Sequence, residues 1–254
     1  MKTFNVLTIS FFFSLMGYTQ YQDSLVSNLT YNIEQATTDS ARIGYKIELI
    51  KQVYKSDVDT TRIIINDVLK VLEDKSENYY QSCKATALNY LGILDTKESK
   101  TEQALTTYLK ALDISQNLKD SINLGLTFHN LGMFYKRQKE FDKAKQYLKK
   151  AITIKEQLHN IENLALSHHM LAITYYENKQ QDSLMYHLDI VKNLPCSGLR
   201  KSKANGSLAA FYYSNKAYDK AIHIYKENIG ISKKAQDINA VSYTHLTLPT
   251  TSRV

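Results

Sequence analysis

The sequence predicts an all-α fold assembled from stacked helical hairpins. Only 2 prolines and 8 glycines interrupt the 254 residues, whereas folds rich in tight turns need these residue types at many bends. The second observation is an internal repeat, in which Leu followed by Gly or Ala recurs at intervals of 40, 40 and 37 residues. The four pairs are Leu91-Gly92, Leu131-Gly132, Leu171-Ala172 and Leu208-Ala209. A fixed period of this length is typical of an array of one repeated unit.

Two further positions keep the same register and define the unit. Twelve residues after each small residue stand Ala104, Ala144, Leu184 and Ala221, and four residues later Tyr108, Leu148, Leu188 and Tyr225. Small residues allow two antiparallel helices to approach closely, while a large residue fills the space beside them. Each unit is therefore predicted to be a helical hairpin, and the residues of this register are expected to be structural.

The first 20 residues are predicted to be a signal peptide. Met1 and Lys2 precede an apolar stretch over residues 4–16, and small or polar residues follow at 17–20. This order is typical of a secretory signal, and such a stretch is too short to serve comfortably as a membrane anchor. We therefore expect an exported protein that is periplasmic or attached to the membrane facing the periplasm. A buried first helix is the alternative interpretation.

The elements that follow are expected in a regular order. Residues 21–40 hold a leading helix or cap, and five hairpins occupy 41–75, 79–118, 119–158, 159–195 and 198–234. The second helix of the first hairpin buries either Thr61, Ile65 and Val68 or Ile64, Val68 and Val71. Residues 195–198, which begin with Pro195, are expected to shorten one helix between Val191 and Leu208, because proline cannot continue a helix. This shortening accounts for the 37-residue interval. Residues 235–240 are expected to begin a sixth hairpin.

Residues 241–254 depart from the helical composition. The run Val-Ser-Tyr-Thr-His-Leu-Thr-Leu-Pro-Thr begins at Val241 and resembles the in-frame translation of a transposase-type sequencing adapter. This resemblance implies that the tail is not native and that the natural polypeptide continues beyond Ala240. A disordered C-terminal tail is the alternative interpretation.

The repeat register resembles that of the tetratricopeptide repeat, which places Leu-Gly, Tyr, Ala, an aromatic residue and Ala at matching offsets along two helices. Tyr135, Tyr175 and Tyr212 supply its tyrosine. The departures are Phe128 and His168 at the Trp position, Asp95 at the Tyr position, and Leu184 and Asn228 at Ala positions. The resemblance implies a right-handed α-solenoid. Its period of 40 residues, against 34 for the family, predicts helices of about 17 residues, or roughly 25 Å.

The sequence offers little catalytic chemistry. It contains no phosphate-binding Gly loop and no G-x-S-x-G, H-E-x-x-H or C-x-x-C motif. Cys83 and Cys196 lack metal-ligand spacing, and the adjacent His168 and His169 point about 100° apart on a helix. The net charge of +7 is spread along the chain, which is weak support for nucleic-acid binding. We therefore expect no enzyme, cofactor or metal site and no nucleic-acid partner for this region.

The family resemblance also implies a binding surface, because the inner helix of each tetratricopeptide hairpin lines a concave groove. Carried over to this sequence, the candidate groove residues are Asn89, Ile93, Lys97, His129, Met133, Lys136, Arg137, His169, Ile173, Tyr176 and Tyr213. The mixture of apolar, aromatic and basic side chains suits an extended peptide or a partner helix with acidic character. Lys136 and Arg137 are expected to be exposed, and His129 and His169 to be solvated. An ordinary solvated face is the alternative interpretation.

An exported run of long tetratricopeptide hairpins resembles the N-terminal region of bacterial, Bacteroidota-like sensor histidine kinases and helix-turn-helix regulators. This resemblance implies a protein-protein interaction module that serves as the periplasmic sensor or scaffold part of a truncated signal-transduction protein. Membrane attachment would then come from a missing C-terminal part. The alternative is a standalone exported adaptor that assembles envelope proteins.

Overall fold

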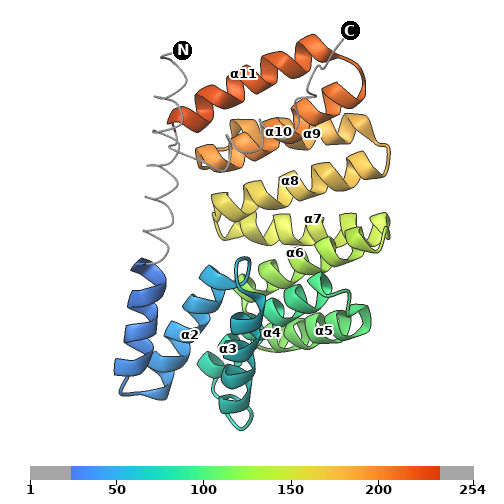
Figure 1. Cartoon of the computed structure of the whole chain (residues 1–254). Helices are drawn as coiled ribbons and strands as arrows, with labels where there is room; N and C mark the ends of the chain where they lie inside the picture. Colours follow the sequence, from blue (N-terminus) through green and yellow to red (C-terminus); the bar gives the residue numbers. More distant parts are fainter. Residues whose placement is uncertain (1–23, 235–254) are drawn as a thin grey trace, which may run out of the picture. The chain divides into compact units, whose positions relative to one another are not determined.

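The computed structural model describes residues 24–234, and helices joined by short turns account for nearly all of them, without a strand among the described residues. The helices follow one another in antiparallel pairs (Figure 1). The expected signal peptide, the start of the sixth hairpin at 235–240 and the adapter-like tail lie outside the described residues. The chain divides into two compact units, one ending at Leu158 and the other continuing from His159.

The first unit contains a leading helix over residues 24–35 and three hairpins. The hairpins are α2 (Asp39–Val53) with α3 (Val58–Val71), α4 (Asn78–Lys97) with α5 (Thr101–Asn117), and α6 (Ser121–Arg137) with α7 (Phe141–Gln157). Successive hairpins pack through their first helices, α2 on α4 and α4 on α6, and through the contacts of α3 with α4 and of α5 with α6. We call the first helix of each hairpin its inner helix.

The second unit contains two hairpins built in the same way. They are α8 (Ile161–Glu177) with α9 (Gln181–Asn193) and α10 (Gly198–Ser214) with α11 (Tyr218–Lys234). The inner helix α10 packs against both α8 and α9. Helices α5, α6, α7, α8, α10 and α11 each have 17 residues, which confirms the predicted helix length. Helix α9 has 13 residues and stops before Pro195, as the shortened interval predicts.

The hairpins are held together where a glycine of the inner helix meets a large side chain of the outer one. A Cβ added at Gly92 would lie 2.6 Å from the Tyr108 ring, and one added at Gly132 would lie 2.6 Å from Leu148 Cγ. Tyr108 is 2% exposed and Leu148 is fully buried. The small and large positions of the repeat are therefore in direct contact, as the sequence register predicts.

The inner helices also begin and end with local structures that recur from hairpin to hairpin. Asp120, Asn160 and Ser197 cap α6, α8 and α10 by accepting a hydrogen bond from the backbone N–H three residues later. At the other end, the left-handed residues Ser99, Lys139, Lys179 and Lys216 have φ of 60° or 61°. The N–H that follows each one bonds back to a carbonyl five residues earlier at 2.8–2.9 Å. These turns use a conformation that favours glycine, yet none of the four residues is glycine.

The structure resolves the register of the first hairpin and one departure from the family pattern. In α3, Thr61, Ile65 and Val68 are buried, whereas Val71 is 39% exposed, so the first of the two predicted registers is correct. Asp95 stands where the family has Tyr, and it is 4% exposed. Its carboxylate lies 2.9 Å from the guanidinium of Arg62 on α3. The substitution thus replaces an aromatic contact with an ion pair between neighbouring hairpins.

We predict opposite effects for alanine at two helical glycines. Alanine is normally favoured over glycine in a helix by about 0.5–1 kcal/mol. Gly132→Ala is nevertheless expected to destabilise the protein by about 1–3 kcal/mol, because the added methyl group would overlap Leu148. Gly206→Ala is expected to stabilise it, since no heavy atom lies within 4 Å of the added Cβ. Urea unfolding followed by circular dichroism measures both. A Gly132→Ala variant as stable as Gly206→Ala would contradict the close approach.

Candidate functional site

A ladder of polar contacts joins the inner helices α4 and α6 of the first unit. Ser82 Oγ donates to Asp120 Oδ2 at 2.6 Å, Thr86 Oγ1 donates to Asn123 Oδ1 at 2.9 Å, and Asn89 Nδ2 donates to Thr127 Oγ1 at 2.8 Å. Each step joins residues 37 or 38 positions apart. Buried and partly buried hydrogen bonds of this kind fix how one repeat sits on the next, because an unmatched register would leave the polar groups unpaired.

The ladder corrects the prediction that Asn89 lines a groove. Its side chain is fully buried, and its Oδ1 also accepts a bond from Asn130 Nδ2 at 3.2 Å. The second unit shows the same arrangement between α8 and α10, where His169 Nε2 lies 2.8 Å from Ser207 Oγ. Asn89 and His169 therefore join repeats, which leaves neither side chain available to a ligand.

The expectation of solvated histidines is wrong. His129 and His169 are each 8% exposed. Burial, together with the positive charges of Arg200 and Lys203, lowers the pKa of His169 to about 4. Both imidazoles belong to the packed interior of their units.

The remaining predicted residues of the first unit lie on an accessible part of α4 and α6. Ile93 and Met133 are partly buried at equivalent places one repeat apart, and Lys97 and Arg137 are exposed at equivalent places near the helix ends. Lys136 is partly buried rather than exposed, and its side chain has an interaction partner. The structure thus combines apolar positions with exposed basic ends on two inner helices that pack together.

The predicted residues of the second unit are more aromatic. Ile173 is partly buried, whereas Tyr176 is 37% and Tyr213 is 41% exposed. The Tyr176 hydroxyl lies 3.1 Å from Ser214 Oγ, and its ring packs edge-on against Phe211 with centroids 5.9 Å apart. These tyrosines offer flat, partly exposed rings at the C-terminal ends of α8 and α10. Such rings are common anchors for peptide partners.

Sequence reasoning missed a buried histidine pair. His168 Nδ1 on α8 lies 3.0 Å from His187 Nδ1 on α9, and the His187 ring stacks on Tyr175 with centroids 5.5 Å apart. Burial lowers the pKa of His168 to about 4. The preceding hairpin has Phe128 and Tyr147 at the corresponding places. The repeat register could have indicated this pair, because His168 stands at the position that holds Phe128 in the preceding hairpin. Within residues 24–234, no group of three or more His, Cys, Asp or Glu side chains could hold a metal ion.

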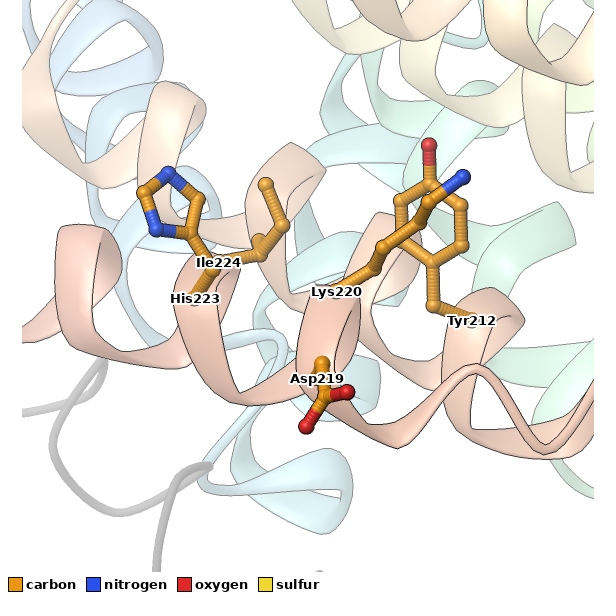
Figure 2. Close-up of a pocket in the computed structure, with 5 residues that line it drawn as sticks. All are labelled: Tyr212, Asp219, Lys220, His223 and Ile224. Atoms are coloured by element: carbon orange, nitrogen blue, oxygen red, sulfur yellow. The ribbon is translucent and has the colours of Figure 1, made fainter.

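The last described hairpin has a hollow in place of this ring contact. In α6–α7 the rings of Tyr135 and Tyr147 stack 5.4 Å apart, and in α8–α9 the corresponding Tyr175 and His187 stack. In α10–α11 the corresponding pair is Tyr212 and Ile224. A hollow of about 340 Å³ opens there, and Figure 2 shows the side chains that line it. They are Tyr212, Asp219, Lys220, His223 and Ile224.

The fold and the repeat contacts agree with the comparison with known families. The tetratricopeptide repeat family matches residues 83–157 and 124–192. Residues 83–192 therefore consist of tetratricopeptide repeats, and the described residues have an all-α solenoid fold. Repeats of this family typically serve as protein-protein interaction modules. This fold class is typically that of a non-catalytic scaffold. Among the described residues, no helix is both long enough and apolar enough to span a membrane.

Three solved structures have similar folds at low sequence identity. BtubC (BKLC) from P. vanneervenii is 19% identical with a TM-score of 0.61, covering 92% of this chain and 96% of that one. The apo form of the quorum sensor NprR from B. thuringiensis is 14% identical with a TM-score of 0.62, covering 93% and 68%. TPR-like repeats from Podosopora anserina are 16% identical with a TM-score of 0.58, covering 79% and 99%. These identities show the fold alone. No curated protein matches the chain.

Filling the hollow is expected to stabilise the second unit. Ile224→Tyr restores the ring that stacks on the corresponding tyrosine in the two preceding hairpins. Cavity filling and ring stacking together are expected to contribute about 1 kcal/mol. The control is Ile222→Tyr on the same helix, where the side chain is 47% exposed and little change is expected. Urea unfolding of the two variants tests the prediction, and equal stabilities would contradict it.

The buried histidines are expected to make the protein sensitive to acid. The pKa of His168 and of His169 in the folded chain, about 4, lies below the 6.5 of a free histidine, so the unfolded chain binds more protons between these values. Stability should therefore be complete above pH 6.5 and decline as the pH falls toward 4. The double variant His168→Phe, His187→Tyr copies the preceding hairpin and should decline less. Urea unfolding at pH 7.5 and 4.5 measures the difference, which would vanish if the histidine pair did not contribute.

Proposed function

We propose that this chain is the exported sensor or scaffold region of a signal-transduction protein, and that it binds an acidic peptide segment along its inner helices. The observation that carries the proposal is the surface of α4 and α6. Ile93 and Met133 provide apolar contacts, and the exposed Lys97 and Arg137 lie four residues further along their helices. Neither Lys97 nor Arg137 forms an ion pair with a carboxylate among the described residues.

Charge and shape support an acidic ligand on this surface. Complementary charge steers association and orients a partner, while apolar contacts at the centre supply most of the affinity. An extended peptide with acidic side chains beside apolar ones would match both features. The similarity in fold to the quorum sensor NprR supports a role in signalling for such an array, as an analogy between folds.

The peptide proposal is tested by fluorescence anisotropy with labelled peptides of equal length that are acidic, neutral or basic. We expect the acidic peptides to bind the full chain most tightly and more weakly at high salt. Arg137→Glu is expected to weaken that binding about tenfold by replacing attraction with repulsion. Lys149→Glu on the outer helix α7 makes the same charge change at an exposed position and is the control. Equal affinities for the two variants would contradict a basic site on α6.

The location and the signalling context need separate experiments. Fusing residues 1–20 to a phosphatase that is active only outside the cytoplasm tests export, and an inactive fusion would contradict it. A long read through the genomic locus past the codon for Ala240 tests the context. A frame that continues into an apolar span and a kinase or DNA-binding domain supports the sensor. A stop codon soon after a sixth repeat supports the standalone adaptor instead, and a genome that encodes residues 241–254 would exclude a sequencing adapter.

A further inference from the structure

Two lysines from neighbouring hairpins meet at one tyrosine ring in the first unit. Tyr54 follows α2, and its ring packs edge-on against Tyr90 of α4 with centroids 4.9 Å apart. Both rings pack against the buried core of α2, α3 and α4. Lys97 Nζ donates to the carbonyl of Tyr54 at 2.8 Å and lies 5.5 Å from the centre of its ring. Lys55 Nζ lies 5.4 Å from the same ring centre.

No carboxylate of the described residues neutralises this pair of ammonium groups. Among the described residues, the hydrogen bonds and ring contacts of Lys55 and Lys97 are those with Tyr54. The carboxylates that flank the two lysines in the sequence have other partners. Asp57 caps α3 through Thr60 N at 2.9 Å, Asp95 binds Arg62 at 2.9 Å, and Glu98 binds Arg62 and Lys100.

The state of Lys97 agrees with this geometry. Partial burial and the nearby charge of Lys55 lower the pKa of Lys97. The two like charges repel each other, and an anion that contacts both would offset the repulsion and add two attractions. A lysine that lies over another tyrosine ring already has such an anion. Lys143 over Tyr135 pairs with Glu140 at 2.5 Å.

We propose that Lys55 and Lys97 form an anion-binding subsite that takes a carboxylate of an acidic peptide, with the Tyr54 ring as its apolar wall. The subsite rests on the proposed function and deepens it, because it assigns one acidic side chain of the partner to a defined place. Tyr54 and Tyr90 pack against the core, and Lys97 is bonded to the Tyr54 carbonyl, so the ring and one of the two ammonium groups are positioned before the ligand binds. Lys97 occupies the place on α4 that Arg137 occupies on α6. A peptide crossing both helices would therefore meet a basic group on each.

The test uses the full chain and a glutamate-rich octapeptide in the anisotropy experiment. The double variant Lys55→Ala, Lys97→Ala is expected to bind the peptide at least tenfold more weakly than the wild-type chain. The control is Lys110→Ala, Lys149→Ala, which removes the same charge from exposed positions on α5 and α7 and should bind within twofold of wild type. A double variant that binds as tightly as the control would overturn the subsite.

A second measurement separates binding from folding. Lys97→Ala removes the hydrogen bond to the Tyr54 carbonyl, whereas Lys55 makes no hydrogen bond among the described residues. The single variant Lys55→Ala is therefore expected to keep the fold and to weaken peptide binding about threefold. NMR titration of the lysine ammonium groups should show a higher pKa for Lys97 when the octapeptide is bound. An unchanged pKa overturns the subsite. If Arg137→Glu weakens peptide binding but the Lys55 and Lys97 variants do not, the subsite is overturned and the proposed function stands. If the wild-type chain does not bind the peptide, the subsite and the proposed function are both contradicted.

Discussion

The close approach of paired helices at a glycine or alanine is the constraint on which this structure depends. Gly92 against Tyr108 and Gly132 against Leu148 leave no room for a methyl group. Because each hairpin closes at this contact, its two helices present a fixed pair of faces to the neighbouring hairpin. The 17-residue helices then follow from the spacing between these contacts and the turns. A solenoid whose units contact only their neighbours needs such a repeated local constraint.

Polar contacts between inner helices add specificity to this apolar packing. The links from Ser82, Thr86 and Asn89 to α6 and from His169 to Ser207 all reach 37 or 38 residues along the chain. Apolar contacts tolerate sliding between helices, whereas buried donors and acceptors do not. The same contacts narrow the candidate binding surface, because they occupy side chains that the family offsets assign to the groove. What remains accessible is apolar in the middle of α4 and α6 and basic near their ends.

The ring positions show how one repeat pattern accommodates different chemistry. Tyr135 with Tyr147 and Tyr175 with His187 preserve a stacked pair, while Ile224 beside Tyr212 leaves a hollow. The histidine version places two imidazole nitrogens 3.0 Å apart inside one hairpin. The lysines at Tyr54 show a third variation, since two cations and the Tyr90 ring lie near one tyrosine. Hairpins with the same pattern thus differ in the chemistry around their rings.

The sequence by itself determined the hairpin class, the register of small and large residues and the shortened helix before Pro195, because these depend on contacts within one hairpin and on local backbone chemistry. Tertiary structure decided which polar residues are accessible. Asn89 and His169 are buried by partners 38 residues away, and His168 meets His187 only when α8 and α9 pair. Lys55 and Lys97 stand 42 residues apart, and only the packing of α2 on α4 brings them to one ring. The sequence period encodes each hairpin locally, whereas the packing of neighbouring repeats decides which polar side chains are buried and which charged groups lie near one another.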